Sequence, residues 1–271
     1  MSTAANSLPP IQWAGSRIRA IAFNTFREAV RDRVLYNLIV FALLLVGAAL
    51  LFGQISVGIE RQVLINLGLA AISLFGIVIA IFIGIGLVSK EIEKRTLYTV
   101  LSRPVRRWEF ILGKFCGLVG TLLVNTFFMA VGFFAALLYL AHKFQRVDGW
   151  LLVAICFIVL QFVVVTALAL LFSSFSSPLL ATVFSFAMFV IGTFAEDLRG
   201  FAAMTSGAVR LLITGIAYLV PNFAAFNVIA QVAHEQPIAP ALVLHNTLYA
   251  LLYASAAIAG AVLIFERRNL K

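Results

Sequence analysis

Few of the residue types that carry chemistry in proteins occur here at spacings that would let them act together. The three histidines, His142, His234 and His245, lack the HxxxH or HExxH spacing of a zinc site. The two cysteines, Cys116 and Cys156, lie singly in apolar runs, which does not indicate metal or redox chemistry. The sequence contains neither a GxSxG nor a GxxxxGK[ST] motif. We therefore expect no catalysis, no metal and no resident cofactor in this chain.

Uncharged polar side chains inside the long apolar segments are the remaining candidates for contact with a solute. Asn66, Asn125 and Gln161 are the amides among them, and they could line a translocation path. Hydrogen bonds between neighbouring helices explain the same residues more simply. Proton-coupled and ion-coupled carriers usually need Asp, Glu, His or Arg at membrane depth, and no such residue lies in the middle of a predicted span. The sequence therefore disfavours a carrier that is driven by an ion gradient.

The composition of the chain excludes an ordinary soluble domain. Of the 271 residues, 63% are hydrophobic and only 11% are charged, whereas soluble domains carry roughly a quarter of charged residues. An apolar helix of about 20 residues crosses the ~30 Å hydrocarbon core of a bilayer. Segments free of charged residues predict six spans, at about 34–53, 63–88, 115–140, 150–172, 178–195 and 245–265. The predicted fold class is an all-α integral membrane protein with a single transmembrane domain over residues 1–271.

The distribution of basic residues predicts the orientation of these spans. With both termini on one side of the membrane, 15 of the 20 Lys and Arg residues fall on that side, which makes it the cytoplasmic side. The acidic residues divide almost equally between the two sides, so the whole net charge of +9 is cytoplasmic. This basic excess indicates contact with anionic lipid, and we expect no nucleic acid partner.

Two segments outside the spans have helical character. Residues 16–33 place apolar side chains on one face and arginines on the other, which predicts an amphipathic helix in the inner membrane interface. This helix is either a basic anchor or a lever that a cytoplasmic partner moves, and both readings stay open. Residues 196–244 are predicted to form an outer loop. Within that loop, the apolar stretch 209–220 is too short to span and predicts a re-entrant or interfacial helix.

The cytoplasmic loop at 90–114 combines charge with helical periodicity. Apolar residues recur at helical spacing in its first half, and Pro104 disfavours helix at the residue before it. Beyond the proline, Gly113, Gly117 and Thr121 form a row of small residues where the third span can approach another helix closely. The loop is therefore predicted to be structured, although a solvated connector is the simpler alternative.

Eight residues of this loop follow the spaced pattern E…TL…L…P…R…GK. They are Glu91, Thr96, Leu97, Leu101, Pro104, Arg107, Gly113 and Lys114. The pattern resembles the signature of ABC-2 type transporter permeases, including the branch associated with copper-enzyme maturation. Residues 221–227 also resemble the stretch that follows the outer re-entrant helix in related permeases. Arg95 is a departure, because many members of the family have Gly before the Thr-Leu pair.

The resemblance implies a permease subunit in the cytoplasmic membrane of a bacterium. Such a subunit pairs with a second copy or a paralogue and recruits two copies of a separate ATPase subunit. The eight residues would belong to a coupling helix held in a cleft of the ATPase, and ATP and Mg would bind to that partner. Two other classes stay open: a secondary carrier or channel, and a non-transporting assembly or mechanotransmission subunit. The residues do not indicate which substrate is moved.

Overall fold

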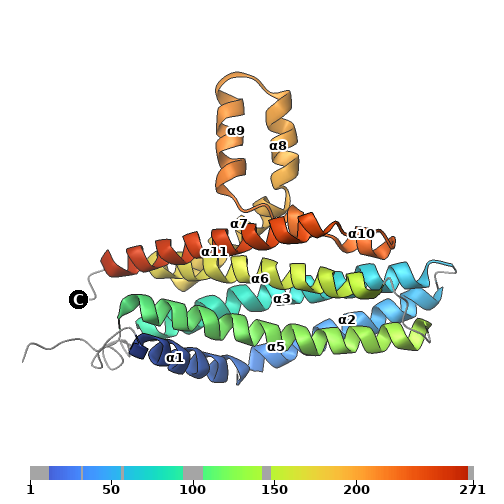
Figure 1. Cartoon of the computed structure of the whole chain (residues 1–271), viewed down its shortest axis with the longest axis horizontal. Coiled ribbons are helices and arrows are strands. Elements are labelled where there is room, and N and C mark those ends of the chain that lie inside the picture. Colours follow the sequence, from blue (N-terminus) through green and yellow to red (C-terminus); the bar gives the residue numbers. More distant parts are fainter. Residues whose placement is uncertain (1–11, 32, 56–57, 94–105, 142–147, 268–271) are drawn as a thin grey trace, which may run out of the picture.

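The computed structural model of the chain describes residues 12–31, 33–55, 58–93, 106–141 and 148–267 (Figure 1). Every regular element within these ranges is a helix. The helices are α1 (Gln12–Val30), α2 (Arg33–Ile55), α3 (Glu60–Glu93), α5 (Arg107–Ala141), α6 (Gly149–Phe175), α7 (Pro178–Thr193), α8 (Ala195–Met204), α9 (Gly207–Leu219), η2 (Ala224–Phe226), α10 (Ile229–Ala233) and α11 (Pro240–Arg267). The chain is thus an all-helical protein, as predicted.

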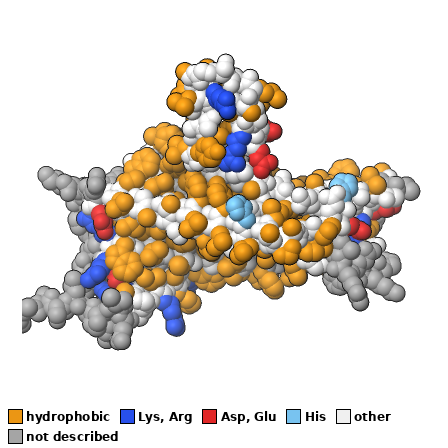
Figure 2. All heavy atoms as spheres, turned by 45° about the horizontal axis from the view of Figure 1, so that its top comes forward, with side chains coloured by type: hydrophobic (Ala, Val, Ile, Leu, Met, Phe, Trp, Pro, Cys, Tyr) orange, Lys and Arg blue, Asp and Glu red, His pale blue; other side chains and the backbone are white. Residues whose placement is uncertain are grey.

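Four of the helices, α3, α5, α6 and α11, are long and apolar enough to cross a membrane. The number rises to six if two bent helix pairs are each counted as one span. Figure 2 shows hydrophobic side chains over the flank of the bundle, with charged side chains at its ends and on one projecting hairpin. This distribution fits a bundle that is solvated by lipid along its length and by water at its ends.

The core of the bundle forms around α6, which packs against α3, α5, α7 and α11. Apolar residues occupy nearly every face of α6, so the helix can be buried on several sides at once. The ring of Phe162 lies directly over Gly76 of α3, where a Cβ would overlap the ring. Gly68 of α3 is covered in the same way by Phe133 of α5. Small residues on α3 thus let large aromatic residues of two neighbours pack against its backbone.

The bundle has two distinct ends. At one end lie α1, the start of α5 against which α1 packs, and the last turn of α11, which is bonded to the start of α5 (Figure 1). We call this the terminal end. At the opposite end lie the start of α3, the start of α6 and the turn after α10. The two ends are held together by different polar contacts, which are described below.

A helical hairpin leaves the bundle from its side. The chain bends by 60° between α7 and α8, and α8 and α9 then pack against each other. Gly207, which begins α9 with a φ of +69°, supplies the left-handed backbone conformation needed at the tip. In Figure 1 the hairpin projects from about the middle of the bundle's length, across its long axis. The sequence predicts an outer loop with a re-entrant or interfacial helix over residues 196–244, and the side of the membrane on which the hairpin lies stays a prediction.

The chain returns from the hairpin to the bundle through an irregular segment, residues 220–228, which we call the return segment. Its backbone is bonded to protein groups: the N–H of Phe223 donates to the carbonyl of Gly192 at 3.0 Å. The side chain of Asn246 on α11 donates to the carbonyl of Ala225 at 2.6 Å, and the hydroxyl of Tyr249 accepts the N–H of Asn222 at 2.9 Å. Irregular backbone is tolerated at membrane depth only where protein groups satisfy it in this way.

Candidate functional site

The eight residues of the loop pattern fall on both sides of a gap in the described chain. Thr96, Leu97, Leu101 and Pro104 lie outside the described residues. Glu91 belongs to the last turn of α3. The other three, Arg107, Gly113 and Lys114, lie in the first turns of α5. We call residues 106–117 the α5 start, and its contacts determine what the loop is connected to.

Arg107 connects the α5 start to the end of α11. Its Nη1 donates to the carbonyl oxygens of Phe265 and Glu266, both at 2.8 Å. Its guanidinium carbon also lies 6.0 Å from the centroid of the Phe265 ring. The last carbonyls of a helix lack partners within the helix and carry partial negative charge. Arg107 therefore acts as a capping group for a helix that is 158 residues away in sequence.

Glu109 connects the α5 start to α1. Its carboxylate is fully buried, with Oε1 3.3 Å from Nη2 of Arg17 on α1. Oε2 accepts the backbone N–H of Arg106 at 3.0 Å. A buried carboxylate needs such partners because transfer out of water is costly for a charge. Nothing in the sequence marks this residue, since one acidic residue in a charged loop gives no indication that it is buried.

Gly113 and Gly117 allow α1 to lie directly on α5. A Cβ at Gly113 would approach Ile21 to 2.7 Å, and a Cβ at Gly117 would lie 2.5 Å from the carbonyl oxygen of Ala22. The close approach predicted from this row of small residues is present, and the neighbouring helix is α1. Thr121 differs from the glycines, because it donates to the carbonyl of Gly117 within its own helix at 3.0 Å.

Lys114 is buried to 1% exposure, and its Nζ lies 5.7 Å from the centroid of the Phe110 ring. A lysine in this position does not present its charge to a protein that docks from outside. The structure thus separates the pattern into two groups. Arg107 and Gly113 hold the α5 start to α11 and α1, and Lys114 is buried against Phe110 of its own helix. The other group, Thr96, Leu97, Leu101 and Pro104, lies outside the described residues.

The three amides suggested for a translocation path do not form one cluster. Gln161 on α6 accepts the hydroxyl of Ser73 on α3 at 3.4 Å. Asn125 on α5 is buried, and its Nδ2 has no hydrogen-bond partner among the described residues. Asn66 on α3 is half-buried. No hydrogen bond joins any two of these amides in the part of the chain that the structure describes.

A cavity of about 200 Å³ lies beside Gln161, between α3, α6, α7 and the return segment. Ser73 and Thr193 also line it, together with aromatic rings from α7 and the return segment. The cavity is therefore mainly apolar with a few uncharged polar groups. Of the three amides suggested from the sequence, Gln161 alone is among its lining residues.

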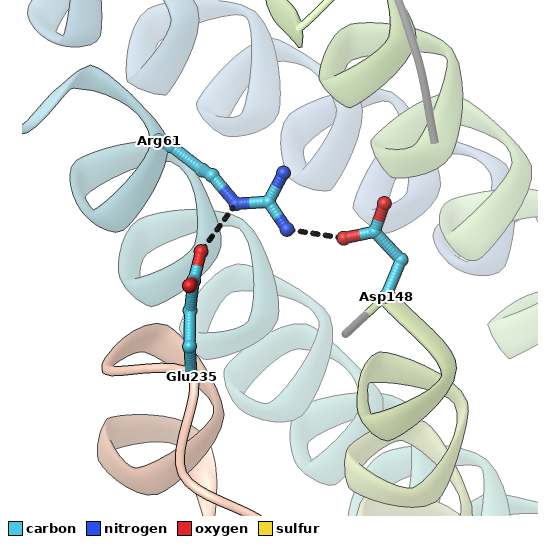
Figure 3. Close-up of polar contacts among 3 residues, drawn as sticks. All are labelled: Arg61, Asp148 and Glu235. Atoms are coloured by element: carbon cyan, nitrogen blue, oxygen red, sulfur yellow. Dashed lines mark hydrogen bonds and ion pairs between the residues drawn. The ribbon is translucent and has the colours of Figure 1, made fainter. Parts of the chain in front are cut away.

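An ionic cluster closes the opposite end of the bundle (Figure 3). Arg61 at the start of α3 lies between two carboxylates: its Nη2 pairs with Asp148, and its Nε lies 3.4 Å from Oε1 of Glu235. Asp148 is buried and directly precedes α6, while Glu235 follows α10 and has a φ of +58°. No local pattern could have paired these residues, because they are far apart in sequence.

Comparison with known proteins agrees with the resemblance seen in the loop. The family described as ABC-2 family transporter protein matches residues 19–270 of the chain. No curated protein matches it. The family match includes most of α1, the α5 start, the α8–α9 hairpin and α11, so it covers both ends of the bundle.

Proposed function

The chain belongs to the ABC-2 family of transporter proteins, and from this premise we propose that it is the permease subunit of an ATP-binding cassette transporter. In this proposal it moves a substrate across the cytoplasmic membrane, with both termini inside the cell. A separate ATPase subunit binds and hydrolyses ATP with Mg, and this chain is not itself an enzyme. Two ATPase subunits serve a pair of permease chains.

The contacts of the α5 start are the observation that carries the proposal. The pattern assigns ATPase contact to residues 90–114, which include the first turns of α5. Within these residues, Arg107 is bonded to the end of α11, and Glu109 is paired with Arg17 of α1. A displacement of the loop would therefore move α1, α5 and α11 together, because packed helices shift as rigid units.

These contacts favour the lever reading of α1 over the anchor reading. A helix that served only as a lipid anchor would need an apolar face toward the membrane. Here α1 also lies in direct backbone contact with Gly113 and Gly117 of α5. Motion of the α5 start is therefore expected to be passed to α1 directly, without an intervening layer of side chains.

Extraction in a mild detergent, followed by affinity purification of this chain, tests the partnership. We expect an ATPase with a nucleotide-binding loop to co-purify in equal amount. If no such ATPase is present in the purified material, the proposal is refuted. Transport by vesicles that contain this chain but no ATP would support a secondary carrier instead.

The coupling role of the loop is tested by the double substitution Thr96→Ala with Leu97→Ala, and separately by Glu91→Gln. We expect each to leave the amount of chain in the membrane unchanged but to uncouple ATP hydrolysis from transport. Gln236→Ala, an exposed residue near the opposite end, is the matched control and should behave as wild type. Unchanged coupling in the loop variants would contradict the assignment of these residues.

A further inference from the structure

A long groove runs along the bundle between α5 and α11, and its volume is about 650 Å³. Eight of its twelve lining residues belong to α11, from Leu251 to Glu266, and they recur every three or four positions. This spacing places them on one face of the helix. Three residues of α5, from Trp108 to Phe115, form the opposite wall, and Val163 of α6 completes the lining. Among the described residues, the groove is therefore formed by these three helices alone.

The lining of the groove is apolar except at one end. Trp108, Ser255 and Glu266 carry the only polar side-chain groups among the lining residues. The hydroxyl of Ser255 donates to the carbonyl of Leu251 within α11 at 2.7 Å, so it needs no outside partner. Trp108 and Glu266 both lie at the terminal end, because α5 begins there and α11 ends there. The groove thus has an apolar interior and a polar end, which we call its mouth.

The groove is about as long as one leaflet of a bilayer. Leu251 and Glu266 are 15 residues apart, which is about 22 Å along a helix. Half of a bilayer, with its headgroup layer, measures about 20 to 22 Å. The three helices are among the four that are long and apolar enough to cross a membrane. With Trp108 in the headgroup layer, where tryptophan is favoured, the interior of the groove lies beside the acyl chains of one leaflet.

Water, a void and a protein helix are all poor occupants of this groove. A buried water needs two to four polar partners, which the interior does not offer, and a void would lose dispersion contacts along the whole lining. Dividing the volume of about 650 Å³ by the length gives a mean cross-section of about 30 Å². A helix about 10 Å in diameter has a cross-section of roughly 80 Å². A single acyl chain of a membrane lipid is both apolar and narrow enough to fit.

Charges at the mouth determine which lipid head fits there. Glu266 lines the mouth and is exposed, so its carboxylate can attract a cation. Arg107 donates to the backbone carbonyl of Glu266 at 2.8 Å, and its neighbour Arg106 is exposed. Guanidinium groups are well suited to bind phosphate. A head that carries both a phosphate and an amine therefore matches this mouth, whereas Glu266 would repel an anionic head that lacks an amine.

We propose that this groove binds a phospholipid with an amine-bearing head, with one acyl chain along α11 and the amine at Glu266. The acyl chain fills the space between α5 and α11 beside the bonds that Arg107 makes to the end of α11. The lipid thus adds to Arg107 in holding these two helices together. The inference rests on the membrane location of α5, α6 and α11. It depends neither on an ATPase partner nor on which side of the membrane the terminal end lies.

Blocking the groove with a large side chain tests the site. Ala259 lines the groove and is exposed, so Ala259→Phe places a ring in the groove and not inside the bundle. The chain is purified in a mild detergent from membranes that contain both phosphatidylethanolamine and phosphatidylglycerol, and the retained lipid is measured by mass spectrometry. We expect the wild-type chain to retain phosphatidylethanolamine and Ala259→Phe to retain at least about tenfold less of it.

The matched control is Ala256→Phe on the same helix. Ala256 is exposed but does not line the groove, so this variant should retain as much lipid as the wild-type chain. Equal retention by the two variants would overturn the proposal, as would a wild-type chain that retains no phospholipid. If Ala259→Phe weakens association between two copies but leaves lipid retention unchanged, a second copy covers the groove and the proposal is wrong.

The substitution Glu266→Gln tests the lipid head and leaves the shape of the groove unchanged. We expect the ratio of retained phosphatidylethanolamine to phosphatidylglycerol to fall about two- to fivefold, because an exposed ion pair contributes modestly to binding. Glu28→Gln on α1 is the control, since Glu28 is an exposed carboxylate outside the groove, and it should not change this ratio. An unchanged ratio in Glu266→Gln would refute the amine contact and with it the proposal. Loss of the ATPase partner in the co-purification experiment would leave all of these results unaffected.

Discussion

Arg107 shows how a single side chain joins two helices that are far apart in the sequence, α5 and α11. It donates to two carbonyls at the end of α11. Lysine has one compact ammonium group where arginine has a fork of donors. The distinction matters because Nη1 of Arg107 donates both bonds while the planar guanidinium also lies over the Phe265 ring, a contact that a lysine ammonium reproduces less well.

We expect Arg107→Ala to lower the free energy of unfolding by about 1 kcal/mol, since the bonds are charge-assisted but partly exposed. Arg107→Lys should recover only part of this loss. Thermal unfolding in detergent measures both changes. Arg106→Ala removes the same charge from an exposed neighbour and is the matched control. Equal effects at the two positions would show that the α11 carbonyls are not the important contact.

The ionic cluster around Arg61 supplies a second test at the scale of residues. Arg61→Met leaves the buried carboxylate of Asp148 without its pair, and we expect a loss on the order of 3 kcal/mol. Adding Asp148→Asn should recover much of that loss, because the isolated charge is removed. A double-mutant cycle on thermal stability gives the coupling between the two residues. If the losses in the free energy of unfolding from the two single substitutions simply add in the double variant, the Arg61–Asp148 pair contributes little.

At the scale of elements, the contact between α1 and α5 depends on the absence of a side chain at Gly117. We expect Gly117→Ala to destabilise the protein by about 1 to 3 kcal/mol, because the new methyl group would force α1 away from α5. Gly120→Ala is the matched control on the same helix, where a Cβ would make an ordinary 3.7 Å contact with Phe26. This control should be neutral or slightly stabilising. Thermal unfolding compares the two variants, and a neutral Gly117→Ala would contradict the close packing.

The return segment is a second element that depends on a few side chains. Asn246→Leu should leave the carbonyl of Ala225 without its donor, at a cost of about 1 to 3 kcal/mol. Thr247→Val on the same turn removes only a bond to the carbonyl of Val243 within α11, and it should have a smaller effect. The comparison of melting temperatures measures the difference. Equal effects would indicate that the segment does not rely on Asn246.

At the scale of the whole molecule, the orientation of the bundle can be tested by labelling. In a chain without its native cysteines, Gln236→Cys near the opposite end should react with a membrane-impermeant maleimide in intact cells. Arg19→Cys at the terminal end should react only after the membrane is made permeable. These positions are both exposed in the structure. If instead Arg19→Cys reacts in intact cells and Gln236→Cys does not, both termini lie outside and the proposed orientation is wrong.

Composition and motif together determined the class and the family. The excess of apolar residues leaves lipid as the only solvent that suits the chain, and this argument needs no contacts. The spacing of Gly113 and Gly117 also predicted a close helix contact correctly, because residues four apart share a helix face whatever lies opposite. The resemblance of the loop was confirmed by the family match over residues 19–270.

Tertiary structure alone decided which segments meet. Arg61, Asp148 and Glu235 are brought together from three separate parts of the chain, and α1 was found to be the helix that lies on Gly113. The bend of 60° between α7 and α8, and the packing of α8 against α9, are likewise features of the fold. The physical reason is that lipid compatibility and helical periodicity are local properties. Pairing between distant helices depends on shape and on the satisfaction of individual polar groups, which only the folded arrangement specifies.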